Sequence, residues 1–412
     1  MMPFDWIVVY VLMYPSIVAL LWLIAAIYYH ILHERIGHVT DDDRSAATKV
    51  TIMVPCYNEG SNIDETIQHL LSLRYDNYDV LLINDGSSDD TAQIIDDWAA
   101  RESKIKALHQ KNQGKATALN NGLEHATGDV LVCIDGDAVL DYDAIAYLVK
   151  AINKSEKIGV ITGNPRVRNR STILGRLQVT EFSSIIGLLK RAQSIYGTIF
   201  TISGVIGAFR KSAIQAVGGW SPDMITEDID VSWKLQMAGY DIVFEPNALC
   251  WVLMPETIRG LFKQRLRWAQ GGAEVFFKYI FRACQFKHRR FWPLLLEYLT
   301  TVLWAYSLIC LLILGVVDQV LMLHLMHYKD FDFNILRGSN FITVCVFLLQ
   351  FMVSLFIDSH YERGLWRSFI WCIWYPFAYW TINLITMVWT FPKAFFRKKG
   401  RLAVWVSPDR GV

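Results

Sequence analysis

Residues Asp129–Asp137 read DVLVCIDGD, an apolar run that ends in two aspartates flanking a glycine. Such a run predicts a strand that is buried on both faces, as in parallel sheets covered by helices. In these sheets ligands bind beyond the carboxyl ends of the strands. The positions of Asp135 and Asp137 therefore predict a ligand-binding site at the end of this strand. Their carboxylates suit a hard divalent cation with positions left for phosphate oxygens and water, which would neutralise a diphosphate leaving group.

The polar segment around this stretch, residues 45–255, alternates strands and helices. We expect strands at Lys49–Val54, Asp79–Asn84 and Lys104–Leu108, and helices at Asn62–Leu73, Thr91–Arg101 and Lys115–Ala126. This order predicts an α/β domain with a parallel sheet. The first two strands run into PCYNE at 55–59 and NDGSSD at 84–89. Such residues also form ordinary turns, but carboxylates at three strand ends favour one shared site.

Two further motifs carry candidate functional groups. Lys115 begins a predicted helix, where it could contact a phosphate, although a solvated surface lysine is the alternative. Thr226 suits the N-cap of a helix that ends near Ala238, which places Glu227 and Asp228 in its first turn. Taken alone, those two carboxylates only complement the helix dipole.

The sequence QRLRW at 264–268 places Gln264, Arg267 and Trp268 on one face of a helix. An amide, a guanidinium and an indole together suit a sugar phosphate, through hydrogen bonds, charge and ring stacking. Apolar and basic residues surround the motif, so residues 256–290 are expected to form amphipathic helices along a membrane surface.

The chain is 53% hydrophobic, and its apolar residues gather in four runs without Asp, Glu, Lys or Arg. These runs are Trp6–Leu32, Tyr298–Val317, Gly338–Ile357 and Ser368–Pro392. Each is long enough to cross a bilayer. We therefore expect an uncleaved anchor at 1–34, about three membrane segments within 291–392 and a basic tail at 393–412. The soluble domain is held between these anchors.

The distribution of basic residues predicts the orientation. Met1–Asp5 has no basic residue and Arg35 follows the first run, which places the soluble domain in the cytoplasm. The tail residues Arg397, Lys398, Lys399 and Arg401 also indicate the cytoplasm. Three later crossings would instead leave the tail outside. Either one C-terminal segment does not cross, or the charge rule fails, and the sequence leaves both open.

Composition excludes other classes of protein. Forty basic against 39 acidic side chains give a net charge of +1, without the positive charge of a nucleic-acid-binding protein. The seven cysteines are scattered and form no CxxC pair, so neither a disulfide framework nor a structural zinc site is expected.

These motifs resemble those of the processive family 2 glycosyltransferases, which include the cellulose, hyaluronan and chitin synthases. The matching positions, in order, are Asp85, Asp135-x-Asp137, Thr226-Glu227-Asp228 and Gln264-x-x-Arg267-Trp268. Within that family, TGNPR at 162–166, SIIGL at 184–188 and WVSPDRG at 405–411 are similar to the bacterial poly-β-1,6-N-acetylglucosamine synthases of biofilms. The resemblance covers nearly the whole chain. One departure is the single N-terminal span, which is nearer to the shorter form of these enzymes.

The resemblance implies a cytoplasmic GT-A domain of Rossmann-like α/β fold, a UDP-N-acetylglucosamine (UDP-GlcNAc) donor and a divalent cation, magnesium first with manganese as the alternative. The implied roles are uridine binding by Tyr57, Glu59 and Asp85, nucleotide and metal binding by Asp135, metal binding by Asp137, general-base catalysis by Asp228, diphosphate contact by Arg267 and stacking on the acceptor sugar by Trp268. Lys115, Glu227 and Gln264 are further candidates for substrate binding. The segment from Trp405 resembles a gating loop.

The implied reaction is a single inverting displacement, in which one carboxylate deprotonates the acceptor hydroxyl. The resemblance also implies a multi-pass protein of the bacterial inner membrane that exports its polymer, with a small membrane subunit of the PgaD or IcaD type as a partner. Three alternatives remain. They are a related synthase with another product, a non-processive enzyme that charges a lipid phosphate, and an inactive signalling module. The inactive signalling module is suggested by Arg166 and Arg170, which are spaced like an arginine pair that binds cyclic-di-GMP.

Overall fold

The predicted parallel strands form one half of the central sheet in the computed structural model, which describes residues 3–34, 38–321, 333–375 and 379–397. They are β1 (Val50–Cys56), β2 (Tyr78–Asp85), β3 (Ile105–Gln110) and β4 (Val130–Ile134), paired in the order β3-β2-β1-β4. Between them lie α3 (Ile63–Leu71), α4 (Thr91–Arg101) and α5 (Lys115–His125). Every boundary lies within two residues of its predicted position.

The other half of the eight-stranded sheet, in which the sequence predicted no strands, is mixed. The full order is β3-β2-β1-β4-β7-β6-β8-β5. β7 (Ile206–Arg210) runs antiparallel to β4 and to β6 (Ile158–Val167), whereas β8 (Asp241–Val252) is parallel to β6 and antiparallel to β5 (Val139–Leu140). An apolar run indicates that both faces of a strand are covered, but it carries no information on strand direction. The reversal places the start of β7 at the carboxyl edge of β4.

Helices cover both faces of this sheet, because successive side chains of a strand point to opposite faces. In β1, Ile52 and Val54 belong to one core cluster and Met53 to the other. α3 and α6 (Ala144–Ile152) contribute to the first cluster. α5, α9 (Lys211–Ala216) and α10 (Glu227–Met237) contribute to the second. The remaining short helices of the domain are α2 (Asp41–Arg44), α7 (Ile173–Glu181), a π-helix (Phe182–Gly187) and α8 (Leu188–Tyr196).

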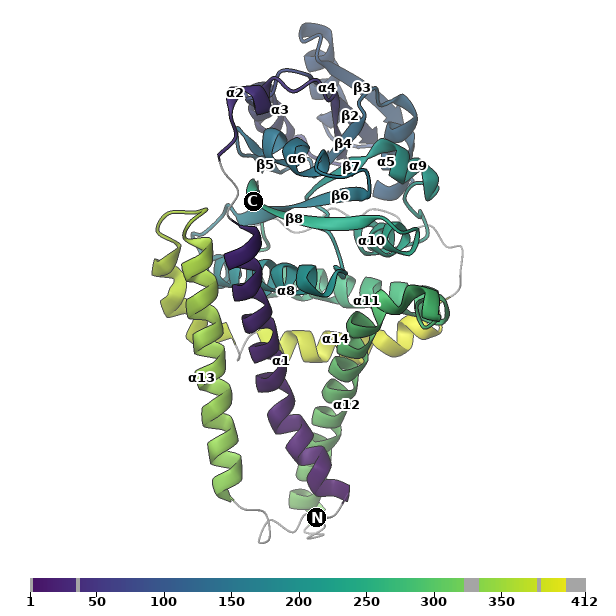
Figure 1. The fold of residues 1–412 in the computed structure, drawn as a ribbon. Helices are drawn as coiled ribbons and strands as arrows, with labels where there is room; N and C mark the ends of the chain where they lie inside the picture. The colour runs from purple at the N-terminus through teal and green to yellow at the C-terminus, as the bar shows by residue number, and fades with distance from the viewer. Residues whose placement is uncertain (1–2, 35–37, 322–332, 376–378, 398–412) are drawn as a thin grey trace.

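Three long helices extend away from this domain and are apolar and long enough to cross a membrane (Figure 1). They are α1 (Pro3–His33), α12 (Trp292–Leu321) and α13 (Phe333–Asp358). The first three apolar runs of the sequence lie within them. Between these helices and the sheet lies α11 (Ile258–Ala283), followed by a short 3-10 helix (Phe286–Phe291), in the region predicted to be interfacial.

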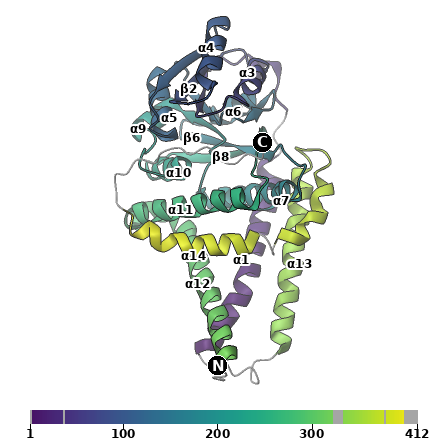
Figure 2. The same cartoon turned by 180° about the vertical axis from the view of Figure 1, so that it is seen from behind.

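The fourth apolar run, Ser368–Pro392, does not form a spanning helix in the residues that the structure describes. It is divided between a 3-10 helix (Leu365–Trp374) and α14 (Thr381–Phe395), whose 15 residues extend about 22 Å, against roughly 30 Å for a hydrocarbon core. α14 instead lies beside α11, across the long helices (Figure 2). The described residues of this run therefore give no candidate span, and a third C-terminal crossing stays a prediction. The proposed gating loop from Trp405 lies outside the described residues.

A buried ionic cluster joins two of the long helices to the domain. Arg191 of α8 pairs with Glu34 after α1 and, at 2.9 Å, with Asp358 at the end of α13. Arg166 of β6 reaches the same Asp358 at 2.7 Å. All four side chains are at most 2% exposed. Removing one partner of such a buried pair leaves an uncompensated charge and costs about 3–5 kcal/mol, so the cluster fixes the domain to the helices.

Candidate active site

The loops after β1, β2 and β4 meet at the carboxyl edge of the sheet, as the sequence predicted. The Asn58 backbone amide donates to Ser87 Oγ at 3.0 Å, and Asn58 Oδ1 accepts from the Ser88 amide at 2.8 Å. A Cβ built on Gly136 would lie only 2.9 Å from Glu59 Cγ, so the loop between Asp135 and Asp137 rests on Glu59. Glu59 is fully buried and Tyr57 is half-buried.

Asp85 binds the loop that follows β3. It is fully buried at the end of β2. Its carboxylate accepts hydrogen bonds from Gln110 Nε2 at 2.8 Å and from the backbone amides of Gln113 and Gly114 at 2.9 and 2.8 Å. In this structure Asp85 therefore fixes the loop that leads into α5 and presents Lys115. Its contact with a uridine stays a prediction, as does that of the buried Glu59.

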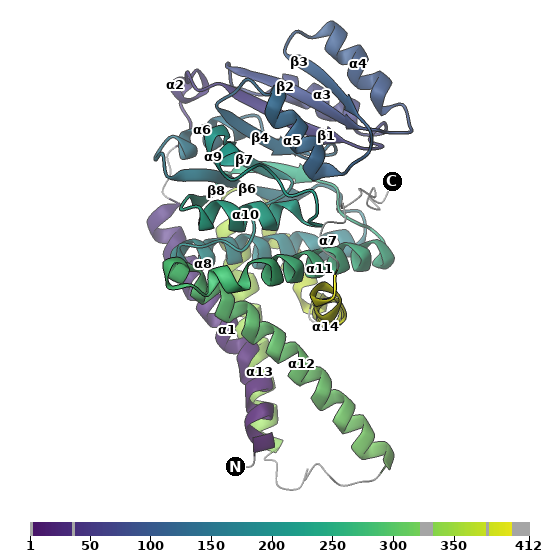
Figure 3. The ribbon, with the colours of Figure 1, turned by 90° about the vertical axis from the view of Figure 1, so that its right-hand side faces the viewer.

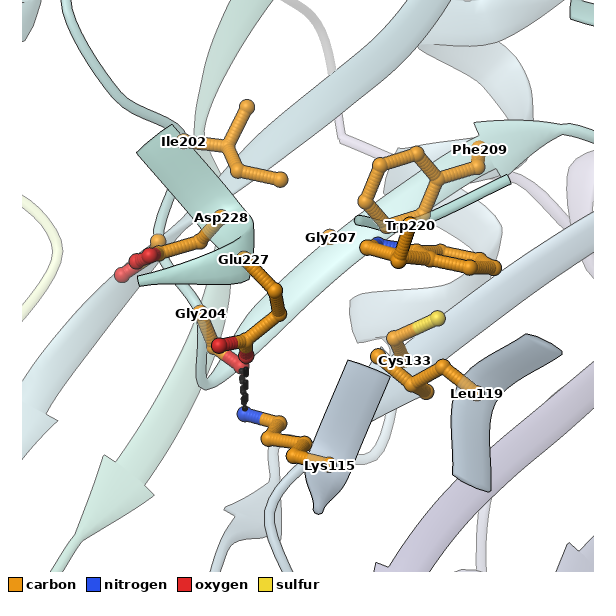
Figure 4. A pocket seen from close by; sticks show the side chains of 11 residues that line it. Lys115, Leu119, Cys133, Ile202, Gly204, Gly207, Phe209, Trp220, Glu227 and Asp228 are labelled. Atoms are coloured by element: carbon orange, nitrogen blue, oxygen red, sulfur yellow. Dashed lines mark hydrogen bonds and ion pairs between the residues drawn. The ribbon is translucent and has the colours of Figure 1, made fainter. Parts of the chain in front are cut away.

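Lys115, the first residue of α5, extends its ammonium toward Glu227 and Gly204 (Figure 4). Its ammonium donates to Asp135 Oδ1 at 2.5 Å and to the Gly204 carbonyl at 3.0 Å, and it pairs with Glu227 Oε1 at 3.2 Å. Burial works against the ammonium, but the carboxylates of Asp135 and Glu227 outweigh it and hold the pKa of Lys115 above its usual range. The alternative of a solvated surface lysine is therefore wrong, since only 17% of the side chain is exposed.

Asp228, in the first turn of α10, lines the same narrow cavity as Lys115 and Glu227. Burial raises the pKa of Asp228 to about 6, and the adjacent Glu227 carboxylate acts in the same direction. The charges of Lys115 and Arg267 oppose this rise. A carboxyl group with a pKa near 6 can both accept a proton at neutral pH and hold it well enough to act as a general base.

Asp135 and Asp137 fit a hard divalent cation by the chemistry of their donor atoms, because carboxylate oxygens are its preferred ligands. Asp135 is 25% exposed at the mouth of the site, and Asp137 is buried two residues further along the loop. The described part of the chain has no group of three His, Cys, Asp or Glu side chains placed to hold a metal ion. A cation at this loop would therefore take its remaining ligands from substrate phosphates and water.

The motif QRLRW lies on α11, which crosses directly beneath the start of α10 (Figure 3). The two helices are close because α11 has glycine at the crossing. A Cβ built on Gly271 would lie 2.1 Å from Thr226 Oγ1. This contact brings Arg267 near enough to lower the pKa of Asp228. Gln264 Oε1 is buried and has no hydrogen-bond partner among the described residues, and Trp268 is partly buried.

The structure therefore brings Lys115, Asp135, Glu227 and Asp228 together and sets the QRLRW helix against them. Sequence reasoning missed Gly204, whose carbonyl accepts from Lys115 and where an added Cβ would lie 3.0 Å from Asp228 Oδ2. The sequence TISG at 201–204, directly before an apolar run, was the available signal. Because β7 is antiparallel, this segment reaches the carboxyl edge at the start of its strand.

Comparison with known proteins agrees with this geometry. Residues 47–271 match the family model described as "Glycosyltransferase like family 2". The chain is 42% identical over 405 residues to a poly-beta-1,6-N-acetyl-D-glucosamine synthase of Staphylococcus epidermidis, with 98% of both chains covered. A synthase of the same name from Staphylococcus aureus is 41% identical, with the same coverage.

Among solved structures, a mannosyltransferase from Pyrobaculum calidifontis in complex with GDP-Man and Mn2+ is similar to this chain with a TM-score of 0.61. The identity is 21%, and the match covers 94% of this chain and 100% of the other. At this identity the likeness shows the fold, and it confirms the GT-A fold that the motifs implied. The chain belongs to the family 2 glycosyltransferases, and it shares nearly its full length with the staphylococcal poly-β-1,6-N-acetyl-D-glucosamine synthases.

Proposed function

We propose that this chain polymerises N-acetylglucosamine from UDP-GlcNAc into a β-1,6-linked polymer at the inner membrane of a bacterium. The observation that carries the proposal is end-to-end similarity, at 42% identity, to relatives named for this product. The site supports it as well, since a carboxylate with a raised pKa, Asp228, lies beside the cationic Lys115.

Asp228 acts as the general base in this proposal. It removes the proton from the acceptor hydroxyl as the hydroxyl oxygen attacks C1 of the donor sugar, and the UDP oxygen leaves with the bond electrons. Lys115 orients Asp135 and Glu227 through its ion pairs, and Arg267 contacts the diphosphate. Because the displacement inverts an α-linked donor into a β-linkage, no covalent enzyme intermediate is required.

Asp135 and Asp137 would hold the divalent cation. When bound, the cation would neutralise charge on the departing diphosphate. Magnesium is our first assignment. Manganese is the alternative, and the mannosyltransferase of similar fold was solved with Mn2+.

The acceptor chain would lie along α11, with Trp268 stacked on its terminal sugar and Gln264 bonded to a hydroxyl. The domain would face the cytoplasm, because Arg35 follows the first apolar run and Arg397, directly after α14, pairs with Glu274 of α11. Export would then pass between the long helices. With three candidate spans, a small membrane subunit of the PgaD or IcaD type would complete the channel.

The rival functions have less support. A synthase of hyaluronan, chitin or cellulose shares the motifs, but the two synthases at 41–42% identity are named for the β-1,6 polymer. The QRLRW motif argues against charging of a lipid phosphate. A cyclic-di-GMP role for Arg166 is disfavoured, because its guanidinium is 2% exposed and paired with Asp358.

The proposal is tested with native membranes that contain this chain, supplied with UDP-GlcNAc and magnesium. We expect a polymer that a β-1,6-specific hexosaminidase degrades and a chitinase does not. Asp228→Asn is the matched control, which should bind UDP and make no polymer. A product that chitinase degrades would show that the linkage is not β-1,6. Near-normal synthesis by Asp228→Asn would show that Asp228 is not the general base. Synthesis without any second protein would argue against an obligate partner.

A further inference from the structure

The first x of the Gln264-x-x-Arg267-Trp268 motif is Arg265, whose side chain is buried. The guanidinium carbon of Arg265 lies 4.2 Å from the centre of the Trp268 ring. At this distance a cation is attracted by the negative face of the indole, and the planar guanidinium also stacks on it. One face of Trp268 is therefore covered by Arg265.

Arg265 is itself held in a fixed position. Its Nη2 donates to Glu181 Oε2 at 2.6 Å, and the two side chains are only 5% and 3% exposed. Glu181 ends α7, so the pair joins two elements that are far apart in the sequence. A charged pair that is buried this deeply is costly to desolvate and is a weak source of stability.

A second contact extends this arrangement toward the C-terminal segment. The ring of Tyr379 lies 5.5 Å from the guanidinium carbon of Arg265. Tyr379 in turn stacks on Tyr375, with ring centres 4.8 Å apart and planes 8° from parallel. Arg265 is thus enclosed by Glu181, Trp268 and Tyr379. These contacts surround the guanidinium, and one of them lies on the face of the indole.

We propose that Arg265, held by Glu181, is a positioning residue that fixes the indole plane of Trp268 so that its opposite face receives the acceptor sugar. This inference rests on the proposed function, in which Trp268 stacks on the acceptor. It assigns the buried ion pair a role in acceptor affinity and none in donor binding. A loose indole would still contact a sugar, but it would lose the fixed orientation that makes the contact productive.

The kinetic test compares Arg265→Leu and Glu181→Gln with Arg259→Leu, an exposed arginine on the same helix. The substrates are UDP-GlcNAc and a soluble β-1,6-linked N-acetylglucosamine oligomer. We expect the KM for the oligomer to rise roughly tenfold in the first two variants, the loss expected for one ring contact. The KM for UDP-GlcNAc should stay within about twofold, and Arg259→Leu should match the wild type. Equal changes in both KM values, or none, would overturn the proposal.

A second measurement does not depend on activity. In protein labelled with 5-fluorotryptophan, the fluorine resonance of Trp268 is identified by its loss in Trp268→Phe. We expect Arg265→Leu and Glu181→Gln to move or broaden this resonance and leave the other tryptophan resonances in place. An unchanged resonance would reject the positioning role even if the wild type makes polymer. If the wild type makes no polymer, the proposed function fails while this result still decides the orientation of Trp268.

Discussion

At the scale of single residues, the site depends on how burial and neighbouring charge act on one carboxyl group. Asp228 and Glu227 are adjacent in the first turn of α10, where the helix dipole favours negative charge. Burial nevertheless dominates for Asp228, and its pKa rises to about 6. Glu227 instead forms an ion pair with Lys115 at 3.2 Å. The two neighbouring carboxylates therefore differ in their electrostatic environment.

This difference predicts the pH dependence of the reaction. A general base must be deprotonated, so the log of kcat/KM should fall with unit slope as the pH drops below about 6. The rate of polymer synthesis between pH 4.5 and 8 measures it, with circular dichroism over the same range to exclude unfolding. A break near pH 4, the ordinary value for an aspartate, would contradict a buried base at this position.

At the scale of elements, the site depends on the crossing of α10 and α11. Thr226 stands at the N-cap of α10, and Gly271 of α11 faces it without room for a methyl group. The neighbouring Gly272 differs, because a Cβ there would meet Phe200 at 3.4 Å, an ordinary contact distance. We therefore expect opposite effects on stability when each of these two glycines is replaced by alanine.

Gly271→Ala should push α11 away from α10, which would separate Arg267 from Asp228. We expect a stability loss of about 1–3 kcal/mol from overpacking and a loss of polymer synthesis. Gly272→Ala should keep activity and gain up to about 1 kcal/mol, since alanine favours a helix interior over glycine. Thermal unfolding and polymer synthesis of both variants check this. Equal behaviour of the two would mean that the close crossing is not required.

At the scale of the whole molecule, three candidate spans predict the orientation of the protein in a membrane. The start of α1 lies at the end of the long helices that is far from the catalytic domain, and α13 returns the chain to the domain (Figure 1). There Arg397, at the start of the tail, pairs with Glu274 of α11 and donates to the Asp223 carbonyl at 2.9 Å. This contact is close to the loop that leads into Thr226.

Labelling of intact cells with a membrane-impermeant maleimide checks this orientation. In a chain with Cys310 and Cys345 replaced by serine, the exposed Cys284 at the end of α11 should react only after permeabilisation. A cysteine introduced by Asp5→Cys at the start of α1 should react in intact cells, which makes it the matched control. If Cys284 in intact cells reacted as fast as the cysteine introduced by Asp5→Cys, the predicted cytoplasmic position of the domain would be wrong.

The sequence by itself determined the elements whose cause is local. Apolar runs predicted β1 to β4 and the helices between them to within two residues, because burial on both faces requires such composition. Charge-free runs of spanning length predicted α1, α12 and α13. The order of the motifs predicted the candidate residues of the active site.

Only the tertiary structure decided what depends on direction and close approach. It reversed β7, which brought Gly204 to Lys115, and it buried Asp85 behind three hydrogen bonds. It also laid α14 beside α11, where composition alone allowed a crossing. Strand direction and helix placement result from contacts between segments far apart in the chain. The hydrophobicity of a segment predicts that it is buried, but the hydrophobic effect has no direction and does not specify which segment buries it.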